Sequence, residues 1–223
     1  MQGFETFHEM VSDYSLSSSG ALAVLAMEFA KAAASNRRRI VLVEGVSDYF
    51  AVTTLAERRG WDLDAMGVTS VPIGGARNVG RFLELLGPHG LDVKTAGLCD
   101  AGEEEYFRRA LTRAGFGSNL TRPHMEALGF FVCTADLEDE LIRCVGVETV
   151  LKIAAAEGEL GAFHTFQRQP QWQGQSGEAQ VRRWLGVTTR RKFRYSKLLV
   201  EALDLHHVPR PLDRLLIHVA RMN

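Results

Sequence analysis

A short apolar run, residues 40–43, leads directly into the polar turn Glu44-Gly45 and limits the possible folds more than any other part of the sequence. Its composition, Ile-Val-Leu-Val, is typical of a strand buried on both faces of a parallel sheet. Further apolar runs of this kind follow at residues 67–73, 93–99 and 130–134. Segments with helical periodicity separate them. Strands that alternate with helices at this spacing predict βαβ crossovers and a parallel sheet covered by helices.

The helical pattern also predicts how the chain is divided. Beyond residue 148 no further strand is expected, and helices follow, interrupted by a glutamine-rich polar loop over residues 164–177. The expected fold class is α/β: a compact, Rossmann-like core with a parallel sheet of about four strands and flanking helices, plus a helical C-terminal extension. We therefore expect an N-terminal helical segment (1–38), a core (39–147) and a helical, basic extension (148–223).

Carboxylates follow three of the four predicted strands. Glu44 and Asp48 flank the first turn, Asp100 ends the third run, and Asp136 and Glu138 follow the fourth. Because the carboxyl ends of parallel strands open into one crevice, we expect these side chains to converge. Hard oxygen ligands of this kind suit Mg²⁺ or Mn²⁺, and such ions act on phosphates.

The charge distribution indicates a polyanionic partner, although the net charge is only −1. Residues 98–140 hold nine Asp or Glu against four Arg, whereas residues 164–197 hold eight Arg or Lys against one Glu. This asymmetry is typical of a metal site beside a nucleic-acid-binding surface. The alternative is that these are two solvated helix faces of opposite charge.

The remaining composition indicates a cytoplasmic protein. Cys99, Cys133 and Cys144 lie at no disulfide or zinc-site spacing, so we expect buried free thiols. No signal-peptide pattern opens the chain, and the apolar stretch 20–34 contains charged residues, so no membrane association is expected.

The acidic positions, taken in order, resemble the TOPRIM domain shared by bacterial primases, topoisomerases and several nucleases. The resemblance covers about residues 39–203, and the nucleases of the overcoming-lysogenization-defect (OLD) family are the most similar branch. The chain also resembles small stand-alone TOPRIM proteins of the nucleotidyl transferase/hydrolase type. The resemblance rests on Glu44-Gly45 with Asp48, Gly74-Gly75, Asp100, and Asp136-Leu-Glu138.

The resemblance implies roles for individual residues. Glu44 takes the place of the catalytic glutamate, and the metal ligands are Glu44, Asp48, Asp100, Asp136 and Glu138. Lys192 takes the place of the lysine that follows the core in OLD nucleases, with Lys197 as the alternative. One position departs from the pattern: Gly102 stands where the family has the second aspartate of Asp-x-Asp. Glu103 or Glu104 can substitute for it.

Two groups of residues are candidates for binding phosphates. Gly74 and Gly75, followed by Arg77, either place a helix start against a phosphate or only make a turn. The second group lies in the basic extension and comprises Arg190, Arg191, Arg194 and Lys197. The aromatic residues among them, Trp184, Phe193 and Tyr195, are stacking platforms for bases or, as is more common, core residues.

The expected function is therefore divalent-metal-dependent phosphodiester hydrolysis of nucleic acid, with DNA the favoured substrate. The alternatives are a catalytically weak nucleic-acid-binding TOPRIM module and a nucleotidyl or phosphoryl transferase with a small substrate. No Gly-x-x-x-x-Gly-Lys-Ser/Thr motif occurs, so we expect no ATP site and place any ATPase on a separate protein partner. A homodimer is compatible with the sequence, which leaves strandedness, base preference and pathway open.

Overall fold

The fold was obtained as a computed structural model that describes residues 19–36 and 38–222. Of the expected N-terminal segment, residues 1–18 and 37 therefore lie outside the described part. The strands are β1 (Arg39–Val43), β2 (Val68–Pro72), β3 (Thr95–Cys99) and β4 (Phe130–Val132). The helices of the core are α2 (Ser19–Ser35), α3 (Val46–Arg58), α4 (Val79–Leu86), α5 (Glu104–Arg113), α6 (Arg122–Ala127) and α7 (Leu137–Val145).

The remaining helices follow the last strand. They are α8 (Val147–Ala156), α9 (Leu160–Gln167), α10 (Gly177–Leu185), α11 (Thr189–Ala202) and α12 (Arg210–Arg221). Short 3₁₀ turns are η1 (Ala76–Asn78), η2 (Ala101–Glu103) and η3 (Pro170–Trp172). No helix in the described ranges is long and apolar enough to cross a bilayer.

The four strands form one parallel sheet in the order β2-β1-β3-β4, which confirms the predicted fold class. The chain leaves β1 toward one side of the sheet to make β2 and then crosses to the other side to make β3. The direction of the connections therefore changes between β1 and β3. In parallel α/β sheets, ligands bind outside the carboxyl ends of the strands at this switch point.

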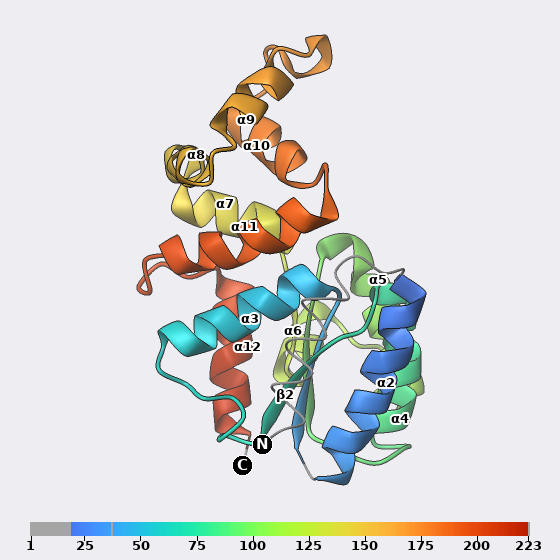
Figure 1. Ribbon diagram of the computed structural model, residues 1–223. Helices are drawn as coiled ribbons and strands as arrows, with labels where there is room; N and C mark the ends of the chain where they lie inside the picture. Colours follow the sequence, from blue (N-terminus) through green and yellow to red (C-terminus); the bar gives the residue numbers. More distant parts are fainter. Residues whose placement is uncertain (1–18, 37, 223) are drawn as a thin grey trace.

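Both faces of the sheet are buried, as the continuous apolar strands require. Along β1, Val41 and Val43 pack into one cluster, whereas Ile40 and Leu42 pack into the other. In Figure 1, α3 and α12 lie on one side of the sheet and α2 and α4 on the other. Cys99 and Cys133 are buried free thiols in opposite clusters, whereas Cys144, which we expected to be buried, is exposed.

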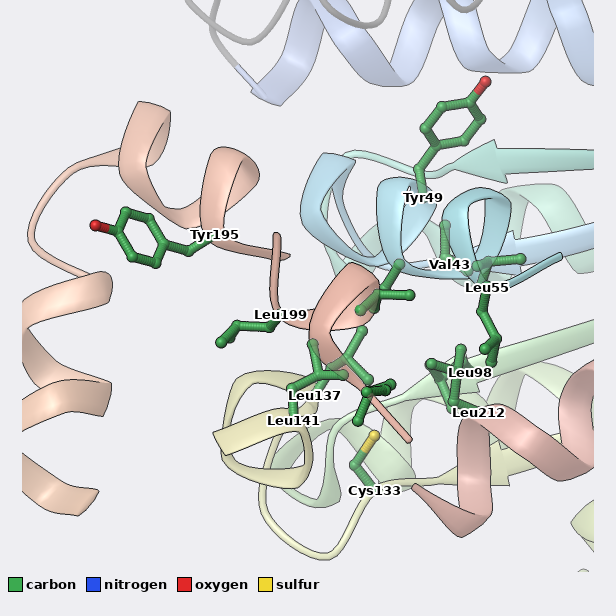
Figure 2. Packing of buried hydrophobic residues seen from close by; sticks show 14 of the residues in the cluster. Val43, Tyr49, Leu55, Leu98, Cys133, Leu137, Leu141, Tyr195, Leu199 and Leu212 are labelled. Atoms are coloured by element: carbon green, nitrogen blue, oxygen red, sulfur yellow. The ribbon is translucent and has the colours of Figure 1, made fainter. Parts of the chain in front are cut away.

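The helical segment that follows the sheet packs against α3. α11 lies along α3, and α7 and α10 lie beside it (Figure 1). Figure 2 shows Leu137 and Leu141 of α7 near Leu199 of α11 in the same buried cluster. α12 then returns to the sheet and packs against β3 and β4. The C-terminal segment thus shares one apolar core with the sheet.

Two parts of the helical pattern differ from the sequence prediction. The polar loop predicted over residues 164–177 is wrong at its start, because α9 runs to Gln167 and buries Phe163 and Phe166. The short helix α6 was not predicted. It begins at a Thr121 cap with a proline in its first turn and buries only Met125, so it has almost no apolar periodicity.

Gly97 in β3 offers a direct test of the packing between strands. A Cβ atom there would lie 2.9 Å from Phe130 Cδ1 and 3.0 Å from the Leu42 carbonyl oxygen. We expect Gly97→Ala to lower the free energy of unfolding by about 1–3 kcal/mol through overpacking. Urea denaturation would measure this. The matched control is Gly102→Ala, which has no atom within 4 Å of its Cβ and should be nearly neutral; equal losses in both variants would contradict the proposed packing.

Candidate active site at the carboxyl ends of the strands

Glu44 and Asp48 are placed by the turn that follows β1. Gly45 lies at the N-cap of α3, and its backbone N–H donates a hydrogen bond of 2.8 Å to Asp48 Oδ2. A negative side chain in the first turn of a helix is favoured by the helix dipole. Glu44 Oε2 is buried and has no hydrogen-bond partner among the described residues. Glu44 thus presents an unsatisfied buried oxygen at the end of β1.

Asp100 and Asp136 are placed by the ends of β3 and β4. Asp100 directly follows β3, and its Oδ1 accepts a hydrogen bond of 3.3 Å from the Leu137 N–H at the start of α7. Asp136 caps α7, with Oδ1 accepting from the Asp139 N–H at 2.8 Å. Glu138, in the first turn of α7, is only 8% exposed. The bond between Leu137 and Asp100 thus joins the end of β3 to the start of α7, the helix that follows β4.

The electrostatics show that these carboxylates surround one site. Burial, followed by repulsion from Glu138 and Glu44, raises the pKa of Asp48 to about 7. Burial, together with the charges of Asp48 and Glu44, raises the pKa of Asp100 to about 8. The pKa of Glu44 is also raised, by burial and then by Glu103, Glu138 and Asp136. Since each acid raises the pKa of the next, their charges are poorly compensated.

Two basic side chains from the helical segment enter this acidic region. Lys192 Nζ of α11 lies 3.0 Å from Glu138 Oε1. Burial alone would lower the pKa of Lys192, but Glu138 and Asp48 raise it above its ordinary value. Arg182 of α10 makes an ion pair with Asp136. The sequence pattern gave no reason to choose Arg182 over its neighbours, because the pairing joins residues 46 positions apart.

The donor set fits a hard divalent cation in its chemistry, although it does not form a ready cage. Among residues 19–36 and 38–222, no three His, Cys, Asp or Glu side chains are grouped closely enough to hold a metal ion. Glu138 and Asp136 point instead to Lys192 and Arg182. The unsatisfied Glu44 oxygen and the raised pKa values of Asp48 and Asp100 are nevertheless what a site built for added positive charge requires.

The surroundings of Gly102 distinguish between the two candidate substitute ligands, Glu103 and Glu104. Gly102 has open space on its Cβ side. Glu103 is the charged neighbour that most raises the pKa of Glu44, so it lies near that carboxylate. Glu104 instead makes ion pairs with Arg108 and Arg122. Of the two glutamates, the structure therefore brings only Glu103 to the other acids.

The glycine turn after β2 also borders the site. The Gly75 N–H donates a hydrogen bond of 2.9 Å to the Glu44 carbonyl oxygen. Both glycines have positive φ angles, 73° at Gly74 and 109° at Gly75, which residues with a side chain rarely adopt. Arg77 follows and is exposed. The turn is thus tied to the end of β1, and an exposed cation follows it along the chain.

The predicted basic residues of α11 have different surroundings. Arg191 donates to Glu159 at 2.6 Å and lies over the Trp184 ring at 4.3 Å, while Arg194 pairs with Glu157 and Glu159. Lys197 lies 3.9 Å from Glu201. Arg190 is exposed and makes no ion pair within the described residues. Trp184 and Tyr195 are core residues, 2% and 0% exposed, and Phe193 is partly buried against the core, as the alternative interpretation expected.

Comparison with known proteins agrees with this fold. The family model for the overcoming lysogenization defect protein-like TOPRIM domain matches residues 37–101, which include β1, β2, β3 and Asp100. The chain thus has a TOPRIM domain that resembles those of the OLD family. Such a domain supports a nucleic-acid-related, metal-dependent nuclease family, and TOPRIM domains generally bind divalent metals. Among curated proteins, none matches the sequence.

The similarity to solved structures extends beyond the strands. The C-terminal region of the Xanthomonas campestris pv. campestris OLD protein is 25% identical, with 82% of this chain and 94% of that chain covered and a TM-score of 0.64. The C-terminal region of the Burkholderia pseudomallei OLD protein is 19% identical, with 82% and 97% covered and the same TM-score. The helical segment after the TOPRIM core therefore belongs to the shared fold.

The crowded carboxylates predict an unusual pH dependence of stability. The folded-state pKa of Asp100 is about 8, above its ordinary value of 3.8, so the folded protein favours the protonated form of this side chain. Protonation of Asp100 therefore contributes fully to the stability of the folded protein below about pH 4, and this contribution is lost as the pH rises through about 8. In EDTA at pH 8, we expect Asp100→Asn to raise Tm by at least about 2–4 °C, the shift given by about 1 kcal/mol in a domain of this size.

Thermal unfolding of Asp100→Asn and of the wild type, at pH 5 and at pH 8, would measure this difference in Tm. The amide oxygen of the substituted side chain can still accept the hydrogen bond from the Leu137 N–H, so Asp100→Asn removes mainly charge. Asp92→Asn is the matched control, because Asp92 is exposed and has a φ angle of 50°, which asparagine tolerates. A loss of stability in Asp100→Asn at pH 8 would contradict the electrostatic account.

Proposed function

We propose that this protein is a divalent-metal-dependent nuclease that hydrolyses phosphodiester bonds of nucleic acid, with DNA as the favoured substrate. The observation that carries the proposal is the meeting of Glu44, Asp48 and Asp100 at the switch point of the sheet, with Lys192 beside them. The OLD-like TOPRIM domain supports it. Buried carboxylates beside a lysine at this position are better suited to stabilising the charge that develops on a reacting phosphate than to stabilising the fold.

The acids have separate roles in this proposal. Glu44, Asp48 and Asp100 would hold Mg²⁺ or Mn²⁺, with Asp136 and Glu138 as further oxygen donors released from their basic partners. A bound divalent ion supplies Lewis-acid polarisation of the phosphate and a more acidic water. Glu44 Oε2 is buried and has no hydrogen-bond partner within the described residues. Because the pKa of the Glu44 carboxyl is also raised, this group can take or give a proton.

Lys192 stabilises the negative charge that develops on the phosphate during cleavage. Its ammonium already lies at the site, 3.0 Å from Glu138 Oε1, and it can turn to the phosphate when Glu138 turns to the metal. Its raised pKa keeps it positively charged throughout the working pH range. Arg77 and Arg190 are exposed cations that can contact neighbouring phosphates.

Specific observations favour each alternative. The Lys192–Glu138 and Arg182–Asp136 ion pairs, together with Gly102 in place of an acid, favour a catalytically weak nucleic-acid-binding module. A cavity of about 460 Å³ beside the acids has the size of a small-molecule site, which favours a nucleotidyl or phosphoryl transferase. Metal-stimulated cleavage separates the nuclease from the binding module, and affinity for free nucleotides identifies the transferase.

The decisive experiment is cleavage of supercoiled and single-stranded DNA with Mg²⁺, Mn²⁺ or EDTA. We expect metal-dependent cleavage that Glu44→Gln reduces by roughly 10²–10⁴-fold, because it removes a metal ligand and a proton-transfer group. Glu84→Gln, an exposed glutamate on α4, is the matched control and should cleave normally. No cleavage by the wild type, with nucleic-acid binding retained, would support the binding module instead.

Gly102 allows the missing acid to be restored. Because its Cβ side is open, we expect Gly102→Asp to fold and to lower the Mg²⁺ concentration for half-maximal cleavage by roughly tenfold, or about 1.4 kcal/mol of binding. Gly102→Asn is the control, since it has the same shape without the charge. Titration of cleavage against Mg²⁺ gives the measurement; identical curves for the two variants would show that the position does not face the metal.

A further inference from the structure

The cavity of about 460 Å³ lies directly beside the candidate active site. It is bounded by the start of α7, the turn η3 and the helices α10 and α11. It shares Asp136, Glu138 and Lys192 with the active site, and its other wall is formed by Trp172, Arg182 and Arg183. A substrate whose phosphate reaches Lys192 therefore has its neighbouring nucleotide at this cavity.

Trp172 provides a fixed aromatic surface in this cavity. It lies in the 3₁₀ turn η3, and its ring stacks on Phe166 with centroids 5.1 Å apart and an interplanar angle of 26°. The Trp172 carbonyl oxygen accepts a hydrogen bond of 2.7 Å from Gln180 Nε2 of α10. Trp172 is partly buried against the core cluster, and it also lines the cavity. Phe166 thus supports the ring on one side, and the exposed part of Trp172 faces the cavity.

The cavity also has a cation available for a phosphate. Arg183 on α10 is exposed and makes no ion pair within the part of the chain that the structure describes. Arg182, one residue earlier, is already paired with Asp136. An aromatic surface combined with a free guanidinium is the arrangement that binds a nucleotide of a single strand through base stacking and charge.

We propose that this cavity holds one unstacked base of the substrate on Trp172 and its phosphate on Arg183, so that the substrate is single-stranded or locally unpaired nucleic acid. The proposal rests on the proposed function and specifies its substrate class. In a duplex, each base is stacked on both faces, and exposing one costs a few kcal/mol. A site that stacks a base on a side chain therefore selects strands whose bases are already free.

Binding in EDTA tests this inference without cleavage. Fluorescence anisotropy would give the Kd of the full chain for labelled single-stranded DNA, single-stranded RNA and duplex DNA. We expect Trp172→Ala to weaken single-strand binding by about 5–150-fold, as the loss of about 1–3 kcal/mol of stacking implies, and to leave duplex binding nearly unchanged. Trp172→Phe should retain most of the affinity, and the RNA arm shows whether the sugar matters.

Arg183→Glu is a second variant, which does not depend on the Phe166–Trp172 packing. It should weaken single-strand binding by at least tenfold, whereas Arg221→Glu, a charge reversal of another exposed arginine on α12, should not. Equal losses of affinity for single strands and for duplexes would overturn the proposal. An unchanged affinity for single strands in Trp172→Ala, or in Arg183→Glu, would also overturn it. Because binding is measured without metal, failure of the nuclease proposal would appear separately, as intact single-strand binding with no cleavage.

Discussion

The parallel pairing of β1 with both β2 and β3 determines where the candidate site forms. It forces the chain to leave β1 in one direction and β3 in the other, and so opens a crevice at their carboxyl ends. Glu44 and Asp100 are the residues that directly follow these two strands. Their meeting is a consequence of strand order, and any parallel sheet with this order and these residues would bring the two acids together.

The helical segment completes what the sheet leaves unbalanced. Repulsion among the acids at the strand ends raises the pKa values of Glu44, Asp48 and Asp100, and the described strands place no Lys or Arg at that end of the sheet. Lys192 and Arg182, from α11 and α10, each neutralise one of these acids. In the metal-free protein they reduce the repulsion, and the acids that they leave uncompensated, Glu44, Asp48 and Asp100, are those with raised pKa values. The two ion pairs therefore stabilise the fold, and they leave three acids available to a cation.

Much of this arrangement could be predicted from the sequence, because it depends on local patterns. The β-branched run before Glu44 identifies a buried strand, and the rule for parallel strand ends then brings Asp100 to the same crevice. The contribution of α9 and η3 could not be predicted in this way. Trp172 lies among glutamines in a stretch without clear periodicity, and its support by Phe166 is a tertiary contact. The pairing of Arg191 with Glu159, 32 residues apart, is equally invisible in a linear pattern.

The position of Lys192 relative to Asp48 depends on how α11 packs on α3. The buried Ser196 hydroxyl donates a hydrogen bond of 2.6 Å to the carbonyl oxygen of Ser47, the residue before Asp48. Ser196 lies one helical turn after Lys192, so this bond fixes the register of α11 against the first turn of α3. Leu199 and Val200, fully buried one turn later, hold the same interface. The distance between the lysine and the acids is thus set by core packing, and the helical segment contributes directly to the candidate active site.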